Sequence, residues 1–555
     1  MKRRTAVQLL MWSLLAAAGC SSTAEPPLPA CSSALASQVT LSIGADTVIY
    51  PVADSGCVTF AANLSTVDSA EYLLVPQSAA ETFGQSSPFL LRTTTLAAAA
   101  AVAQGVIAAT SSPRLAAVQF DGFLRHLARS GSIGAANLAQ SAAVPSPMAV
   151  PPQPAGPPIL GSLRKFTVCA TLACTSFKVV TARTATVGMH VAIYVDTLAP
   201  KRGLNSADLD TLKQVFDSRL YPLDTATFGG VSDIDTNSVV IVLMTGVVNK
   251  LVSRTTCLSQ GFIAGFFFSP DLDVTAPSSI SNHGEIFYSI VADSSGTLSC
   301  PHSRAEVKAV LPGTFTHEFQ HMINYVQHVL VRPGQAEEGW LDEGLSKYAE
   351  ELAGRSYLPG DTATFSQYAI GDVVDAYQYL SATGSSPLLI EFDQGTLAEV
   401  GASWLFVRYL VDQYGSSLPG KLDQTSVNGA ANVVAQTGHA FDTTLTRWAL
   451  ANWVSDLPGF TAPPELQYTS WHFRSTYASL NAQDPVDFPL PYPLVPARSA
   501  GNAVSLSGTL RSGSGVYLRA LQGPSDPAFT LLFRRSFTAL FPVAVGAQLD
   551  VIRIR

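Results

Sequence analysis

The stretch Thr-His-Glu-Phe-Gln-His occupies residues 316–321 of the chain. Positions four apart lie on one face of an α-helix, so His317 and His321 can direct both imidazoles at one metal ion. Glu318 lies beside that pair, where its carboxylate can act on a water molecule instead of binding the ion as a ligand. The stretch therefore predicts a metal-binding helix that carries its own general base.

A third ligand is expected further along the chain. Catalytic zinc sites use three protein ligands and leave a fourth position open. The stretch Trp-Leu-Asp-Glu-Gly at 340–344 supplies Glu343, on a second helix expected over 341–352, and Pro-Gly-Gln at 333–335 predicts a turn between the helices. The alternative is an ordinary helix with two solvated histidines. Apolar neighbours argue against it, namely Phe315, Phe319, Met322, Ile323 and Val326.

Residues 317–321 and 340–346 resemble the zinc motifs of gluzincin metallopeptidases, in particular those of the hyicolysin-type bacterial peptidases. The resemblance covers roughly residues 166–457 and implies an α+β, thermolysin-like zincin: a mixed sheet, an active-site helix and a helical lower lobe. It also implies the site residues, with Glu318 as general base and with zinc ligands His317, His321 and Glu343.

The sequence departs from the family pattern at two places. Thermolysin-like enzymes orient a histidine with an aspartate four residues after the glutamate ligand, and Lys347 stands there in this chain. Pro312 and Gly313 interrupt the active-site helix and predict that it begins only near Thr314. The family also uses a lower-lobe Tyr or His to stabilise the oxyanion. Spacing does not choose among the candidates Tyr368, Tyr377, Tyr379 and His439.

The first 20 residues predict export. A basic start and a short apolar run end at Cys20, which resembles a bacterial lipoprotein signal, with Cys20 as the lipidated residue and Ser21 indicating the outer membrane. Ala17 stands where leucine is more usual, so secretion after another cleavage stays open. The run is too short for a transmembrane anchor. We expect a membrane-anchored or extracellular protein with a tether over residues 21–37.

The chain contains 7 cysteines, and removing Cys20 leaves an even six. Outside the cytoplasm such cysteines form disulfides. Pairing of neighbours is the simplest of the 15 connectivities that six cysteines allow, and the others stay open. The neighbour pairs are Cys31–Cys57, Cys169–Cys174 and Cys257–Cys300.

Composition and alternation divide the mature chain into domains. Alternating apolar residues and an amphipathic helix that begins at Ser112–Pro113 predict an N-terminal β-sandwich domain over 38–130. An Ala/Pro-rich linker follows over 131–162. We expect the zinc peptidase domain over 163–480 and a small C-terminal β domain over 497–555.

Charge and the remaining polar motifs suggest few other partners. The net charge of −8 is spread without blocks, and charged residues make up 13%, so nucleic acid is not an expected partner. Oxygen-bearing side chains alternate over Asp233–Asn237, which indicates either a calcium site or an Asx-rich turn. An EF-hand would need Gly at 238 and Glu at 244, where the chain has Ser238 and Met244. We expect His283, His328 and His439 to be ordinary histidines.

The motifs together predict zinc-dependent hydrolysis of peptide bonds in protein or peptide substrates. An endopeptidase is favoured over an aminopeptidase, because the sequence has no Gly-Ala-Met-Glu-Asn-like stretch upstream of the motif. The alternative is a non-catalytic surface lipoprotein, for binding or adhesion, with a structural metal site. Glu318 favours the enzyme, because a structural site needs no base.

Overall fold

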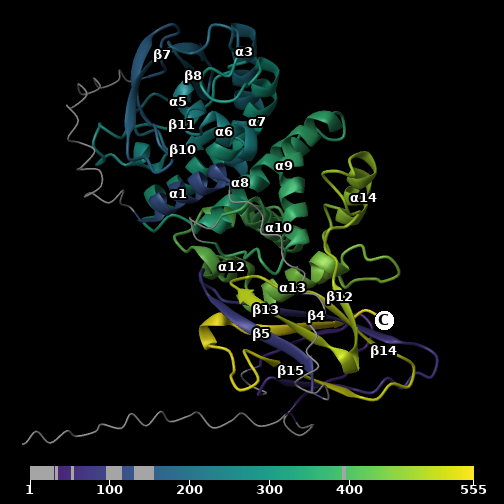
Figure 1. Cartoon of the computed structure of the whole chain (residues 1–555). Coiled ribbons are helices and arrows are strands. Elements are labelled where there is room, and N and C mark those ends of the chain that lie inside the picture. The colour runs from purple at the N-terminus through teal and green to yellow at the C-terminus, as the bar shows by residue number, and fades with distance from the viewer. Residues whose placement is uncertain (1–30, 32–35, 52–54, 95–114, 131–155, 391–394) are drawn as a thin grey trace, which may run out of the picture.

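The computed structural model describes residues 31, 36–51, 55–94, 115–130, 156–390 and 395–555. Its fold is mixed α and β, as predicted. In Figure 1 a sheet with its helices lies at one end, a helical region follows, and a β-sandwich lies at the other end. The signal peptide with Cys20, most of the tether and most of the linker fall outside the described residues. Within those residues, no helix is both long and apolar enough to cross a membrane.

The sheet at the first end has six strands in the order β10-β11-β9-β8-β7-β6. β8, β9 and β11 run parallel, whereas the outer pairs are antiparallel. β10 is an edge strand. The bounds are β6 Leu163–Cys169, β7 Phe177–Val187, β8 Val191–Asp196, β9 Val240–Met244, β10 Gly265–Phe267 and β11 Ile286–Ser289.

Helices cover this sheet and build the middle of the molecule. One hydrophobic core joins sheet and helices and includes Phe166, Phe319, Leu341 and Trp404. The bounds are α1 Ala116–Ser130, α3 Ser206–Val215, α4 Tyr221–Thr227, α5 Gly246–Asn249, α6 Arg254–Gln260, α7 Arg304–Tyr325, α8 Gly339–Arg355, α9 Thr362–Ser381, α10 Leu397–Tyr414, α11 Leu418–Asp423, α12 Gly429–Thr437, α13 Phe441–Val454 and α14 Phe473–Gln483.

The β-sandwich combines strands from both ends of the chain. Its sheets have the orders β1-β3-β15-β5-β13 and β12-β14-β4-β16-β2. The bounds are β1 Ser37–Val39, β2 Asp46–Ile49, β3 Cys57–Phe60, β4 Ala70–Ser78, β5 Ser86–Thr93, β12 Ala497–Ala500, β13 Ser505–Arg511, β14 Leu518–Gln522, β15 Phe529–Arg534 and β16 Ala547–Arg553.

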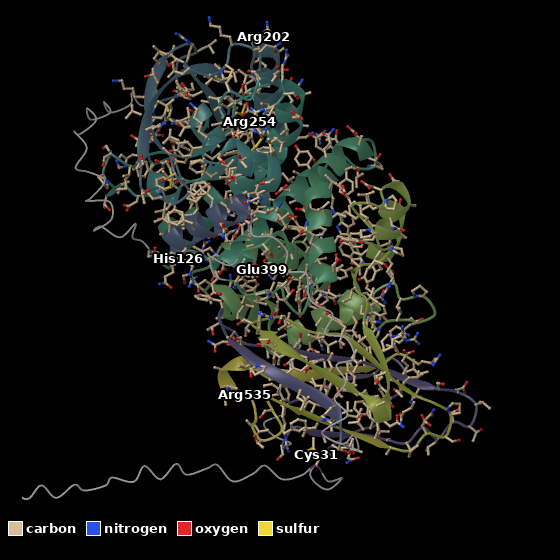
Figure 2. All side chains as sticks on the ribbon, in the orientation of Figure 1. Cys31, His126, Arg202, Arg254, Glu399 and Arg535 are labelled. Carbon is tan, nitrogen blue, oxygen red and sulfur yellow. A yellow bond between two sulfur atoms is a disulfide. The ribbon has the colours of Figure 1, made fainter. Side chains whose placement is uncertain are left out.

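This topology differs from the two separate β domains that we expected. β5 pairs with both β13 and β15, and β4 lies between β14 and β16, so neither β region completes a sheet without the other. Alternation identifies each strand, but it carries no information on partners that lie hundreds of residues away. In Figure 2, Cys31 and Arg535 lie at the sandwich end of the molecule, and Arg202 and Arg254 lie in the region at the opposite end.

The disulfides expected from the even cysteine count are present. Neighbouring cysteines are joined as Cys31–Cys57, Cys169–Cys174 and Cys257–Cys300. The first lies in the sandwich, and the other two lie in the region of the six-stranded sheet.

Replacing Phe60 by alanine tests the joint sandwich. Phe60 of β3 is fully buried and stacks on Phe529 of β15, with ring centroids 4.6 Å apart. Phe60→Ala should lower the free energy of unfolding by about 3–5 kcal/mol, because it leaves a cavity between strands from both chain ends. Chemical unfolding measures this loss. The control Val543→Ala, at an 84% exposed position, should change little; equal effects would contradict the topology.

Candidate metal centre

α7 carries the His-Glu-x-x-His motif in a buried position. It begins at Arg304, because Ser303 caps it and exchanges two hydrogen bonds with Glu306. The expected start near Thr314 is wrong: Pro312 lies inside the helix. Proline removes one N–H donor, yet the capping box and tertiary packing keep the turn before it helical.

His317, His321 and Glu343 come together as the motifs predict. The Nε2 atoms of the two histidines lie 3.1 Å apart. Glu343, on α8, places its carboxylate oxygens 3.6 Å from Nε2 of His317 and 3.5 Å from Nε2 of His321. Oε1 of Glu343 is buried and has no hydrogen-bond partner among the described residues. Three converging ligand atoms with one unsatisfied carboxylate oxygen fit a bound cation.

Gly344 explains how Glu343 reaches this position. A Cβ atom on Gly344 would lie 2.7 Å from the carbonyl oxygen of Ser403 and 2.8 Å from Cγ2 of Val407, both on α10. The glycine after the ligand therefore lets α8 pack closely on α10 while its opposite face meets α7. A larger residue would push the ligand helix away from its neighbour.

Each histidine is oriented by a carboxylate from α8. Nδ1 of His317 lies 2.8 Å from Oε1 of Glu350, and Nδ1 of His321 lies 3.0 Å from Oδ1 of Asp342. A carboxylate accepts, so each Nδ1–H donates and each Nε2 turns its lone pair toward the centre. Lys347 lies 3.1 Å from Oε1 of Glu350 and holds that acid in place. Glu350 thus orients His317, a role for which an acid was expected at the position of Lys347.

Sequence reasoning missed both orienting acids. Glu350 follows Glu343 by two helical turns and therefore lies on the same face of α8, a signal that the spacing contains. Asp342 directly precedes Glu343 in the sequence. Its carboxylate contacts His321, which lies one helical turn after His317 on α7.

The two imidazoles differ in their proton affinity. Burial lowers the pKa of His317, but its hydrogen bond to Glu350 and the surrounding carboxylates outweigh burial and raise the pKa to about 9. Burial and the charge of Arg125 hold the pKa of His321 well below its ordinary value. The Nε2 atoms of His317 and His321, which face each other, can therefore share one proton or bind one cation between them.

α1 reaches the centre from a distant part of the sequence, and we had expected it in the N-terminal domain. Nη1 of Arg125 lies 3.4 Å from Oδ2 of Asp342, and both side chains are buried. Nη2 of Arg125 donates to the carbonyl oxygen of Phe267 on β10, at 3.5 Å. Phe120 packs edge-on against Phe266 of the same strand. Arg125 thus links α1, the edge strand and the acid that orients His321.

Glu318 is not one of the three converging candidate ligands. Its Oε2 accepts a hydrogen bond of 2.8 Å from the backbone N–H of Phe267. Gly265 makes this contact possible, because a Cβ atom there would lie 2.6 Å from Thr314 of α7. Burial raises the pKa of Glu318, and the positive charges of His317 and Arg125 oppose that rise. A carboxylate with a raised pKa is suited to accept and return a proton.

A cavity of about 870 Å³ opens at this centre. Its wall includes His317, Glu318 and Glu343, together with Asp121 of α1. Burial and the nearby carboxylates of Glu343 and Glu318 raise the pKa of Asp121 well above its ordinary value. Of the four expected oxyanion candidates, Tyr368 lines the cavity. The other three have contacts elsewhere: Tyr377 with Leu490, Tyr379 with Trp448 and His439 with Tyr414.

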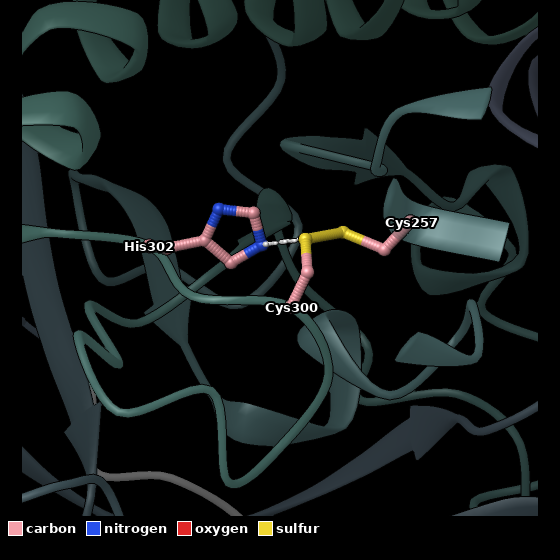
Figure 3. Close-up of side chains that lie close together, drawn as sticks. All are labelled: Cys257, Cys300 and His302. Atoms are coloured by element: carbon pink, nitrogen blue, oxygen red, sulfur yellow. Dashed lines mark hydrogen bonds between the residues drawn. A yellow bond between two sulfur atoms is a disulfide. The ribbon is translucent and has the colours of Figure 1, made fainter. Parts of the chain in front are cut away.

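The other histidines singled out in the sequence lie away from this centre. His328 is buried, with its Nε2 3.1 Å from the carbonyl oxygen of Leu422, and His283 contacts Ser281. Elsewhere, His302 lies beside the disulfide of Cys257 and Cys300 (Figure 3), and its Nε2 is 3.6 Å from Sγ of Cys300. Cys300 is bonded to Cys257, so neither sulfur is a thiolate ligand while that disulfide is intact.

The chain matches no family model and no curated protein.

We expect Glu350→Gln to weaken metal binding about 10–100-fold, because the amide orients His317 less firmly than the carboxylate does. Competition with a chromophoric chelator measures the affinity. The control Glu81→Gln, at an exposed position on the sandwich, should bind metal as the unmodified protein does. Unchanged affinity in Glu350→Gln would show that its contact with His317 is incidental.

Arg125→Met tests the link between α1 and the centre. The substitution leaves Asp342 buried without its guanidinium partner, which should cost about 3–5 kcal/mol of unfolding free energy. The matched control is Arg129→Met on the same helix, whose side chain is 26% exposed and lies 3.7 Å from Glu338. That change should cost about 1 kcal/mol or less. Equal losses in chemical unfolding would contradict the assigned role of Arg125.

Proposed function

We propose that this chain is an exported zinc-dependent endopeptidase of the gluzincin type, anchored through a lipid on Cys20. The observation that carries the proposal is the convergence of His317, His321 and Glu343, with each imidazole oriented by a carboxylate and with Glu318 beside them. The unsatisfied Oε1 of Glu343 fits a metal ligand. Two nitrogens and one carboxylate, with a cavity on the open side, form the donor set of catalytic zinc.

A thermolysin-like arrangement is the finer part of the proposal. It is supported by a mixed sheet whose edge strand β10 borders the motif helix, and by helices α8 to α10 beyond that helix. β10 has no strand on its outer side among the described residues, and an extended substrate can pair with such an edge. The cavity would hold the side chains next to the cleaved bond.

Glu318 carries the proton transfer in this mechanism. Zinc held by His317, His321 and Glu343 would polarise the substrate carbonyl and acidify a water molecule. Glu318 takes the proton of the attacking water and delivers it to the leaving amine. The backbone N–H of Phe267 fixes the carboxylate of Glu318 for both transfers. Tyr368, the oxyanion candidate in the cavity wall, would donate a hydrogen bond to the developing negative charge.

The test is cleavage of a quenched fluorescent peptide library by the zinc-loaded protein. Glu318→Gln should keep about one zinc per chain and lose activity by about 10²–10⁴-fold, because only proton transfer is removed. His321→Ala should lose both zinc and activity, and the control Glu81→Gln should lose neither. Full activity in Glu318→Gln would refute the assigned base. Zinc binding without cleavage of any peptide would favour the non-catalytic surface protein.

A further inference from the structure

A second group of carboxylates lies at the ends of two neighbouring strands. Asp233 and Asp235 precede β9, and Glu285 directly precedes β11. β9 and β11 are parallel neighbours, with Ile241 paired to Ile286, so their N-terminal ends lie side by side. One carboxylate oxygen from each of the three acids lies within 4.8 Å of the other two.

Glu285 is the member that points to a ligand. It is 2% exposed. Its Oε1 accepts hydrogen bonds from Oγ of Ser232 at 2.6 Å and from the backbone N–H of Ile234 at 2.9 Å. Its Oε2 is buried and has no hydrogen-bond partner in the described part of the chain. An unsatisfied, buried carboxylate oxygen is costly unless a cation or donor meets it.

The fold holds Asp235 beside Glu285. A Cβ atom on Gly284 would lie 2.8 Å from Oδ2 of Asp235, so glycine at that position admits the carboxylate. Nη1 of Arg164 lies 3.8 Å from the same oxygen. Burial nevertheless raises the pKa of Asp235 to about 6, since it outweighs the guanidinium, and Glu285 and Asp233 add to the rise. The group thus sets three carboxylates against the one guanidinium of Arg164.

We propose that Asp233, Asp235 and Glu285 bind one calcium ion that ties the start of β9 to the start of β11. All three offer hard carboxylate oxygens, and calcium accepts six to eight oxygen ligands in flexible geometry. Asp233 is exposed, so water can complete the coordination on its side. The proposed site differs from an EF-hand loop, because its buried ligand, Glu285, lies outside the segment over 233–237 and directly precedes another strand.

The ion would act on stability and not on chemistry. β11 pairs with β10, and β10 positions the N–H of Phe267 against Glu318. An ion bound at the start of β11 therefore stabilises the sheet edge that borders the metal centre. Loss of the ion should make that edge less stable and leave the proposed zinc ligands in place.

The experiment measures calcium binding and the thermal unfolding midpoint of the full chain with calcium chloride, magnesium chloride or chelator. Calorimetric titration should give about one calcium per chain, and calcium should raise the midpoint by several degrees. Magnesium should raise it less, because it demands regular octahedral geometry. Absence of calcium binding in the unmodified protein would overturn the proposal.

Variants distinguish this site from the zinc centre. Asp233→Asn, at an exposed position, should fold and lose most of the calcium-dependent shift, and Glu285→Gln should lose it entirely. The control Asp487→Asn, exposed and remote from the three acids, should keep the full shift. His321→Ala should lose zinc and keep the calcium response. A calcium response that survives in both Asp233→Asn and Glu285→Gln would place the ion elsewhere and refute the assignment.

Discussion

The packing of α8 against α7 is the contact on which the rest of the candidate site depends. It places Glu343 opposite two imidazole nitrogens that are 3.1 Å apart, and it brings both orienting acids from the same helix. Gly344 lets the other face of α8 lie against α10. One pair of helices thus supplies the three candidate ligands, the acids that orient the two histidines and the proposed base.

Buried charge is the second constraint. Asp342, Glu343 and Glu350 are held within the protein, with Arg125 and Lys347 as the adjacent cations. Buried carboxylates are costly without compensation, and Oε1 of Glu343 lacks a hydrogen-bond partner among the described residues. A divalent cation at the centre would satisfy that oxygen and replace the proton that the surrounding carboxylates otherwise favour on His317. The unsatisfied oxygen is the physical reason to favour a metal centre over a pair of ordinary buried histidines.

Local sequence signals predicted the local structure well. The helices that carry His317 and Glu343 and the strands in the two terminal β regions follow from local sequence patterns. α7 begins earlier than the expected start near Thr314, because the capping box of Ser303 and Glu306 starts the helix ahead of Pro312. Long-range arrangements could not be read. Nothing in the sequence indicates that β5 pairs with β13, that Arg125 reaches Asp342, or that Glu285 joins Asp233 and Asp235.

We propose that one zinc ion is held by His317, His321 and Glu343. X-ray absorption spectroscopy at the zinc edge of the zinc-loaded protein tests it most directly. Zinc bound by these residues should have nitrogen and oxygen neighbours at about 2.0–2.2 Å and the more distant scattering pattern of two imidazoles. Sulfur ligands at about 2.3 Å would instead point to Cys257, Cys300 and His302 with their disulfide reduced, and would contradict this assignment.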